Sequence, residues 1–347
     1  MSTDLSLSVL DQSPIRLGGT AAQALRETVV LAQETERLGY RRYWVAEHHN
    51  TASFAGTAPE ILIGQIAAHT SRIRVGSGGV MLSHYSALKV AETFRLLSAL
   101  YPGRIDLGIG RAPGSDQQTA LALAYPRPMA DLNAFPRQVV DLAGFLAGEL
   151  PAGHPFAAIA AQPGPPAVVP DLWLLGSSDY SANLAAALGL PFAFADFFGS
   201  AGDIGPRVAA LYRQDFKPSL HLHAPRLSVA VHVICSETAD SAHYIASSMR
   251  LMVAQLRTGA VRTAILAPEE AAKQELDSVH SQFVAGFTRH FIEGDPDQVL
   301  AQLSAVAERY GTNDLTIATN CFSFEDRVRS YRLVAEACAL VPAVDES

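Results

Sequence analysis

Short apolar runs alternate with longer amphipathic segments along most of the chain. The short runs hold few charges and are bounded by glycine, proline or polar residues, as strands buried on both faces of a parallel sheet are. They predict eight strands, at residues 5–9, 43–46, 73–82, 105–110, 172–176, 191–195, 227–235 and 315–319. The segments between them have helical periodicity, so the chain is expected to repeat strand–helix units.

Polar residues at four places are typical of helix N-termini and predict where helices begin between these strands. They are Thr20 with Gln23, Thr57 with Glu60, Asp295 with Gln298, and Ser323 before the last helix.

The number of strands favours a (β/α)8 barrel, the TIM barrel, because eight parallel strands close that fold. A doubly wound open sheet is the alternative, since it also alternates strands and helices. Residues 111–170 and 236–314 are longer than a plain connection needs and are expected to be insertions after strands 4 and 7. No linker or internal repeat interrupts the pattern, so residues 1–347 are expected to form a single domain.

The composition argues against several classes of function. Of the 347 residues 49% are hydrophobic and 17% are charged, which is enough apolar material for a large core. The net charge of −8, without a cluster of Lys and Arg, argues against nucleic acid as a partner. No apolar run is long enough to span a bilayer, and the first residues lack the basic region of a signal peptide. Three widely spaced cysteines suit neither a disulfide framework nor a zinc site, which favours the cytoplasm.

The second predicted strand ends in the polar sequence Glu47-His48-His49-Asn50. In a barrel, the C-terminal ends of the strands carry the chemistry. Three interpretations are open: a metal site, a general acid/base or hydrogen-bond donor at the barrel mouth, or histidines satisfied by their surroundings. The metal site is the least favoured, because neighbouring residues of a strand point to opposite faces.

The fifth predicted strand ends at Gly176, where hydroxyl-bearing residues and a new helix follow. The free N–H groups at a helix start suit a phosphate, and the hydroxyls would add donors. Arg111, after strand four, could reach the same anion. The alternative is a plain N-cap formed by Ser178 or Asp179. The hydroxyl-bearing residues are Ser177, Ser178, Tyr180 and Ser181.

The third predicted strand contains Ser77-Gly78-Gly79 near its end. Glycines there would let the backbone approach a flat ligand closely or adopt an unusual peptide geometry. A bend in the barrel wall would require the same residues, so both interpretations stay open.

Five segments, spread over nearly the whole chain, together resemble the bacterial luciferase-like family of flavin-dependent monooxygenases. They are YWVAEHHN, RVGSGGVML, LKVAETFRLLSALYPGRIDLGIGRAPGSD, WLLGSSDYSANLAAALGLPFAFA and GDPDQVLAQL. The chain is most similar to the small luciferase-like oxidoreductases of this family and less so to the light-emitting subunits. The resemblance implies a (β/α)8 barrel that binds FMN.

The resemblance also implies roles for residues at matching positions. His48 falls at the active-site histidine, close to the reacting face of the flavin. Gly79 and Val80 fall where the third strand backs the flavin ring, and Arg111 falls beside the flavin phosphate. The residues that match the phosphate-binding turn are Ser177, Ser178, Tyr180 and Ser181.

The implied activity is that of an FMN-dependent monooxygenase, which uses reduced FMN and O2 through a peroxyflavin on a small organic substrate. A separate NAD(P)H:flavin reductase would supply the reduced FMN, and a homodimer is the assembly that the family implies. Two alternatives remain: a deazaflavin-dependent reductase or dehydrogenase on the same barrel, and a flavin-binding protein without turnover.

One departure from the family concerns the residue before Arg111. The light-emitting subunits carry a cysteine there, and this chain carries Gly110. The resemblance therefore predicts no cysteine near the barrel mouth and no light emission from an aldehyde.

Overall fold

The computed structural model describes residues 4–112, 114, 116–126, 128–129, 131–164, 169–198, 204–219, 222–258, 264–274 and 290–342. Its strands are β1 (Ser6–Asp11), β2 (Arg42–Val45), β3 (Arg74–Met81), β4 (Ile105–Gly110), β5 (Asp171–Gly176), β6 (Phe192–Ala195), β7 (Leu227–Cys235), β8 (Ile292–Gly294) and β9 (Asp314–Ala318). Its α-helices are α1 (Ala21–Arg37), α2 (Pro59–His69), α3 (Ala87–Leu100), α4 (Gln117–Ala124), α5 (Phe135–Ala147), α6 (Asp179–Leu188), α7 (Ile204–Gln214), α8 (Ala239–Thr258), α9 (Pro268–Ala271), α11 (Pro296–Tyr310) and α12 (Phe324–Ala337). Short 3₁₀ turns lie at η1 (Leu82–His84), η2 (Leu132–Ala134) and η3 (Asp196–Phe198).

Eight of these strands form a closed parallel ring in the order β1, β2, β3, β4, β5, β6, β7, β9. The ring closes because β9 pairs with β1 and β6 pairs with β7, so no edge strand remains in it. The prediction of a (β/α)8 barrel is confirmed, and the open sheet is wrong. The short strand β8, which the sequence pattern did not reveal, pairs with the end of β7 outside the ring.

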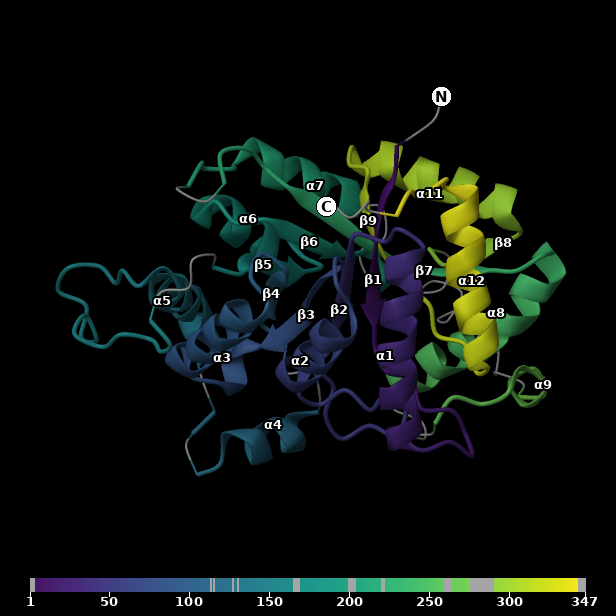
Figure 1. Ribbon diagram of the computed structural model, residues 1–347, viewed down its shortest axis with the longest axis horizontal. Helices are drawn as coiled ribbons and strands as arrows, with labels where there is room; N and C mark the ends of the chain where they lie inside the picture. Colours follow the sequence, from purple (N-terminus) through teal and green to yellow (C-terminus); the bar gives the residue numbers. More distant parts are fainter. Residues whose placement is uncertain are drawn as a thin grey trace.

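The connections after β4 and β7 are the longest in the barrel. The first carries α4, η2 and α5, and the second carries α8, α9, β8 and α11. In Figure 1 the strands run from the top of the barrel downward, and α4 lies beyond their lower ends. The C-terminal ends of the strands, where both long connections begin, are therefore at the bottom of this view.

Three of the four predicted helix caps are confirmed. The side chain of Thr20 accepts from the Gln23 N–H, and Ser323 accepts from the N–H three residues on. Asp295 forms a complete capping box with Gln298. The prediction at Thr57 is wrong, because α2 begins at Pro59 with Ala58 as an N-cap that makes no side-chain hydrogen bond. Proline already suits the first helical position, where no N–H needs a partner.

Side chains alternate between two apolar layers along each strand. The outer layer packs the strands against the helices; Val229, Val231 and Val233 of β7 belong to it. The inner layer fills the barrel; Leu10, Trp44 and Trp173 belong to it. This alternation decides which residues face the inside of the barrel, and therefore which can line its mouth.

A network of ion pairs, buried at Arg42 and Asp106, forms the floor at the N-terminal end of the barrel. Asp106 lies 2.5 Å from the Arg74 guanidinium and 3.4 Å from that of Arg42. Arg42 also reaches Asp314 at 3.0 Å, and Arg74 reaches Asp171 at 3.3 Å. Each charge has a partner of opposite sign, which offsets the cost of removing it from water.

Two tryptophans lie directly on the mouth side of this ionic floor, inside the barrel. Trp44 donates from Nε1 to Asp106 at 2.9 Å, and its ring meets the ring of Trp173 edge-on at 5.3 Å. The guanidinium groups of Arg42 and Arg226 lie over Trp173 at 5.0 Å and 4.6 Å from the ring centroid. The half of the barrel nearer the N-terminal ends of the strands is thus filled by large side chains.

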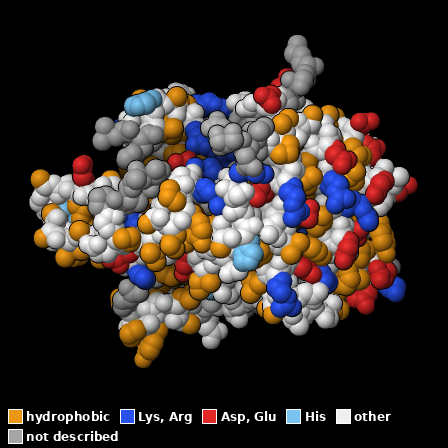
Figure 2. Space-filling model, in the orientation of Figure 1, with side chains coloured by type: hydrophobic (Ala, Val, Ile, Leu, Met, Phe, Trp, Pro, Cys, Tyr) orange, Lys and Arg blue, Asp and Glu red, His pale blue; other side chains and the backbone are white. Residues whose placement is uncertain are grey.

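The described helices include none that is long and apolar enough to cross a membrane. Figure 2 displays side chains of both charges interspersed over α1, α11 and α12, whereas orange side chains are more frequent over α2 and α3.

Candidate active site at the barrel mouth

Glu47 organises the end of β2 through three hydrogen bonds. Its carboxylate is fully buried and accepts from the Met81 N–H at 2.9 Å, from the Tyr85 hydroxyl at 2.8 Å and from His49 Nε2 at 2.8 Å. Burial and the nearby Glu47 charge raise the pKa of Tyr85, so Tyr85 stays a donor. These contacts tie the end of β2 to the end of β3 and give His49 a structural partner.

His48 points elsewhere and has no such partner. Its backbone N–H donates to the Gly56 carbonyl at 2.8 Å, and its ring packs on Phe54 with centroids 4.7 Å apart. Nδ1 is buried without a hydrogen-bond partner, and no described residue bonds to Nε2 either. Burial, with a smaller contribution from His49, lowers the pKa of His48 to about 4. The imidazole is therefore neutral at physiological pH, with one nitrogen able to donate and the other able to accept.

The two histidines separate as strand geometry requires, so the chelating interpretation is not supported by their directions. Within the described ranges, no group of three or more His, Cys, Asp or Glu side chains is arranged to hold a metal ion. Asn50, in the left-handed region at φ 51°, donates to Asp116 and Thr119 at 3.1 Å and 3.0 Å. Together with the His49 N–H, which reaches the Gly114 carbonyl at 3.3 Å, this joins the end of β2 to the segment after β4.

The ends of β3 and β4 lie unusually close together. The Gly78–Gly79 peptide bond is cis, and the register with β4 shifts between Gly78 and Val80. A Cβ on Gly79 would lie 2.8 Å from the Gly108 carbonyl oxygen, and a Cβ on Gly108 would lie 2.2 Å from that of Ser77. Only glycine fits at either position, so the backbone itself forms this part of the wall. Of the sequence interpretations, the unusual peptide geometry is confirmed.

Val80 has a different surrounding from Gly79. Its side chain is buried in the outer apolar layer, between the strands and the helices. Only the backbone of Val80 is left to border a ligand in the barrel.

The structure brings Arg111 and the turn after β5 together. The Arg111 guanidinium stacks on the ring of Tyr180 at 4.1 Å from the centroid. Ser178 is the N-cap residue of α6, yet its side chain makes no capping hydrogen bond. A Cβ on Gly176 would lie 2.2 Å from the Ser181 hydroxyl, which therefore sits directly over the end of β5. The plain N-cap interpretation of Ser178 is not supported, and the N–H groups of the first turn keep their capacity to bind an anion.

Small residues surround the half of the barrel interior that lies nearer the mouth, which we call the upper half. Ala46, Ala193 and Ala318 belong to the inner layer, and Ala230 faces inward because both its neighbours belong to the outer one. Gly108 adds no side chain at all. On the mouth side of the two tryptophans, these residues give part of the inner wall a surface of backbone and methyl groups, beside the larger side chains of Leu175, Phe197 and His232.

One prediction about cysteine is wrong. Cys321 follows the end of β9 and is buried in a second apolar cluster, which we call the mouth cluster because its Phe54 packs on His48. Its other buried members are Ile234, Ala242, Ile245, Ala246, Met249, Met252, Ile265 and Phe291. The prediction rested on Gly110 alone. That position gives no information about a cysteine that the closure of the barrel brings to the mouth from the far end of the chain. Burial raises the pKa of the Cys321 thiol to about 12, so it is not a reactive thiolate.

Sequence reasoning missed His232 of β7. The strand reads LSVAVHVIC, and His232 is its one titratable residue apart from the terminal cysteine. It is 4% exposed and faces inward between Val231 and Val233 of the outer layer. A polar residue at an inward position near the end of a barrel strand was the available signal.

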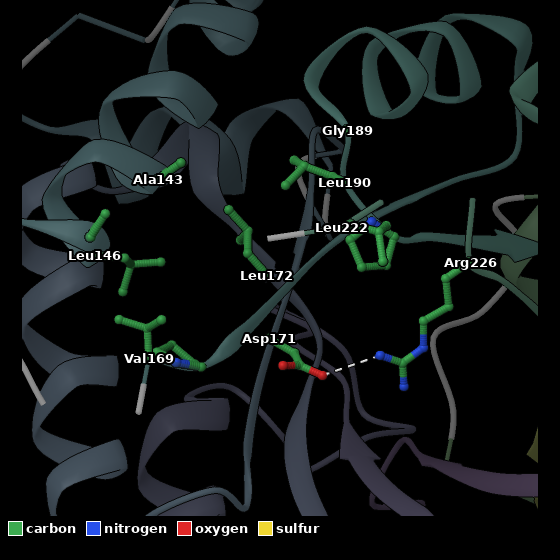
Figure 3. A pocket seen from close by; sticks show the side chains of 12 residues that line it. Ala143, Leu146, Val169, Asp171, Leu172, Gly189, Leu190, Leu222 and Arg226 are labelled. Atoms are coloured by element: carbon green, nitrogen blue, oxygen red, sulfur yellow. Dashed lines mark hydrogen bonds and ion pairs between the residues drawn. The ribbon is translucent and has the colours of Figure 1, made fainter. Parts of the chain in front are cut away.

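A cavity of about 210 Å³ lies at the opposite end of the barrel (Figure 3). It is bordered by the starts of β5 and β6 and by α5, and the Asp171–Arg226 ion pair of 3.3 Å lies at its side. None of the predicted site residues lines it. The candidate site is therefore the mouth, because this cavity lies at the N-terminal end of the barrel, away from all predicted site residues.

The fold and the mouth define a (β/α)8-barrel protein that gathers its polar groups at the C-terminal ends of β2, β4 and β5. The family model for luciferase-like monooxygenases matches residues 5–313, and the chain belongs to this family. It is accordingly an oxidoreductase of the class that incorporates molecular oxygen.

Two relatives cover nearly the whole chain. A luciferase-like monooxygenase of Escherichia coli (strain K12) is 39% identical over 334 residues, 96% of this chain and 96% of its own length. An N-acetyl-S-alkylcysteine monooxygenase of Bacillus subtilis (strain 168) is 37% identical over 336 residues, 96% of this chain and 98% of its own length.

Solved structures extend the similarity in fold. The crystal structure of apo-MsnO8 superposes with a TM-score of 0.85 at 38% identity and covers 98% of this chain and 100% of that one. Two more distant structures share the fold alone. The oxygenating constituent of 3,6-diketocamphane monooxygenase in complex with FMN has a TM-score of 0.69 at 19% identity, covering 96% and 98% of the two chains. An F420-dependent secondary alcohol dehydrogenase has a TM-score of 0.69 at 14% identity, covering 97% and 99%.

Proposed function

We propose that the protein is an FMN-dependent monooxygenase that acts on a small organic substrate with reduced FMN and O2. The observation that carries this proposal is His48, a half-buried neutral imidazole whose buried Nδ1 has no partner in the described structure, at the mouth of a barrel of this family. A buried polar group without a partner is costly, and a ligand that bonds to it removes that cost.

The residues present fit the phosphate and the ring of a flavin mononucleotide. The first turn of α6 and Arg111 would hold the phosphate by N–H donors and by charge, with hydroxyls from the turn after β5. The glycines of β3 and β4 would let the ring lie flat against backbone, with Gly79 beneath it. When bound, reduced FMN would supply the two electrons with which O2 is activated, so that one oxygen atom goes to the substrate and the other leaves as water.

The chain's own residues would protect and orient this chemistry. His48 would donate or accept one proton at the reacting edge of the ring, a role that its neutral state permits. The mouth cluster would keep water away from that edge, since it lines the opening with apolar side chains beside Phe54. Exclusion of water matters because it suppresses release of hydrogen peroxide.

Two alternatives use the same mouth differently. The same fold carries a deazaflavin cofactor in the F420-dependent dehydrogenase, so a deazaflavin-dependent reductase is the first. A flavin-binding protein without turnover is the second. The monooxygenase is favoured because the 37%-identical relative and the family description both carry that activity in their names.

A rapid-mixing experiment tests the proposal. The protein is loaded anaerobically with reduced FMN and mixed with oxygenated buffer while the flavin spectrum is followed. We expect a peroxyflavin that outlives the one formed by free FMN by at least a hundredfold. Reoxidation at the rate of free FMN, together with tight binding of reduced deazaflavin, would instead support the reductase. Reoxidation at that rate with tight FMN binding alone would support the binding protein.

The relatives also suggest where to begin with substrates and partners. The 37%-identical relative acts on N-acetyl-S-alkylcysteines, so thioethers are the first compounds to test. A separate NAD(P)H:flavin reductase is proposed as the source of reduced FMN, because the chain belongs to a family whose resemblance implies such a partner. The three free cysteines are consistent with a cytoplasmic protein.

We further propose a homodimer that forms through α2 and α3. Three large apolar side chains on these helices are exposed, namely Ile61, Leu96 and Leu100, the first at 70% and the last at 61%. Exposed apolar side chains on two helices that contact each other are typical of an interface. Replacing both Ile61 and Leu100 by glutamate is expected to convert the dimer to a monomer in light scattering after gel filtration.

The control for the dimer is Val30→Glu, which adds a single glutamate at an exposed valine on α1 and is compared with each of the single variants Ile61→Glu and Leu100→Glu. It should leave the molar mass unchanged. A wild-type protein that is already monomeric at about 50 µM, well above a dissociation constant on the order of 1 µM, would contradict the proposed interface.

A further inference from the structure

His232 occupies a defined place in the upper barrel. It lies on β7, and its ring packs between two aromatic side chains, Phe197 at 5.1 Å and Phe291 at 4.6 Å between centroids. Phe197 belongs to the inner layer and Phe291 to the mouth cluster. The ring therefore stands at the border between the barrel interior and its apolar cover, held on two sides.

One hydrogen bond fixes the tautomer of His232. Nδ1 lies 3.3 Å from the Ala318 carbonyl oxygen, which can only accept, so Nδ1 carries the proton. Burial lowers the pKa of His232 to about 4, and the ring is neutral at physiological pH. Nε2 then presents a lone pair, and it receives no hydrogen bond from the described part of the chain.

The position of β7 in the ring places His232 across from β3, the strand on which the flavin ring is proposed to lie. From β3 to β7 the ring has four steps in either direction, so the two strands are diametrically opposed. A flat ring that lies with one face on Gly79 of β3 turns its other face toward β7. His232 is therefore on the side of the barrel where a substrate would meet the reacting face.

Apolar surface connects His232 with His48. Phe54, which packs on His48, and Phe291, which packs on His232, belong to the same mouth cluster with Met249. In the described structure His232 makes no ion pair, and its only hydrogen bond is to a backbone carbonyl. A ligand portion beside His232 would meet hydrocarbon and one acceptor, but no charged partner.

We propose that His232 is a specificity-determining residue that accepts a hydrogen bond at Nε2 from a neutral, largely apolar substrate carrying one hydrogen-bond donor. This inference rests on the proposed function, because that function places the flavin on the β3 side. An anionic group would be repelled by the lone pair, and a cationic one would lose its hydration without gaining a counter-charge.

The test uses two thioethers that differ in one donor, 4-(methylthio)phenol and its methyl ether 4-methoxythioanisole. Their binding to the protein loaded with oxidised FMN is measured by calorimetry, with no turnover involved. The wild type is expected to bind the phenol about tenfold more tightly, the effect of one hydrogen bond to a buried acceptor. His232→Phe should abolish this preference. His232→Gln, whose side-chain oxygen replaces Nε2 as an acceptor, should keep most of it.

The affinity for FMN and the thermal midpoint are measured for both variants. We expect FMN binding to stay within about twofold of wild type, and H232Q to remain folded even if H232F does not. Equal binding of both thioethers by the wild type, or no binding of either, overturns the proposal. So does a preference that survives in H232F, or a tenfold loss of FMN affinity in both variants, which would place His232 on the flavin. Because no oxygen chemistry is involved, a failure of the monooxygenase proposal leaves this outcome readable.

Discussion

Replacing His48 by alanine is expected to lower the turnover of the FMN-loaded protein by on the order of 10²-fold to 10³-fold. The affinity for FMN should change by less than about threefold, because the proposed phosphate cradle lies at β4 and α6. The physical reason is the loss of the His48 imidazole, the proposed proton donor or acceptor, which has no hydrogen-bond partner in the described part of the chain. Single-turnover kinetics with reduced FMN and oxygen would separate this loss from any change in binding.

The pH profile gives an independent view of the same residue. With a pKa of about 4, His48 does not titrate between pH 5.5 and 8, so the wild-type rate should not fall across that interval through protonation of this ring.

His49→Gln is the matched control for His48→Ala. Glutamine can keep the bond to Glu47, and the rate should change by less than about fivefold. Turnover of His48→Ala within threefold of wild type would remove His48 from the mechanism.

Replacing Asp11 by alanine is expected to destabilise the fold by about 3–5 kcal/mol, the usual cost of leaving a buried charge without its partner. Asp11 at the end of β1 lies 2.7 Å from the Arg327 guanidinium of α12, and both side chains are at most 2% exposed. Tyr43 and the Ser13 N–H also donate to this carboxylate. Urea denaturation followed by circular dichroism would measure the loss.

A matched control lies on the same helix. Asp326 pairs with Arg329 at 3.0 Å on the surface of α12, and Asp326→Ala should cost less than about 1 kcal/mol. An Asp11→Ala loss no larger than the control would contradict the importance assigned to burial.

Acid should reveal the same Asp11 ion pair. Burial alone would raise the pKa of Asp11, but the Arg327 charge and the hydrogen bonds to the carboxylate outweigh it and lower the pKa. A carboxyl group with a lowered pKa stabilises the fold above its unfolded value and loses this contribution as the pH falls through the folded value. The wild type should therefore lose more stability below about pH 4 than Asp11→Asn does.

The sequence predicts the barrel well because periodicity of apolar residues is a local signal. Each of the eight ring strands lies within two residues of its predicted bounds, and Gly78-Gly79 indicated an unusual backbone before the structure located it. Glu47-His48-His49 raised the right question but not its answer. Which histidine keeps a free ring depends on Tyr85 and Phe54, and both come from other segments.

Contacts between distant strands account for what the sequence could not reveal. His232 is unremarkable in an apolar strand until the ring closes and turns it toward β3. Cys321 enters the mouth cluster only because β9 pairs with β1 and β7. The role of Thr57 was overestimated because proline at the start of α2 makes a capping side chain unnecessary there.

The filling of the barrel changes along its axis, from ion pairs and tryptophans at the floor to methyl groups and bare backbone above them. The ion pairs at the floor are thereby separated from the small residues nearer the mouth. Changing Ala46, Ala193 or Ala230 would alter which molecules fit without touching the pairs around Arg42 and Asp106. An engineer, or natural selection, can thus change these small positions for a new compound while the ion pairs at the N-terminal end stay intact.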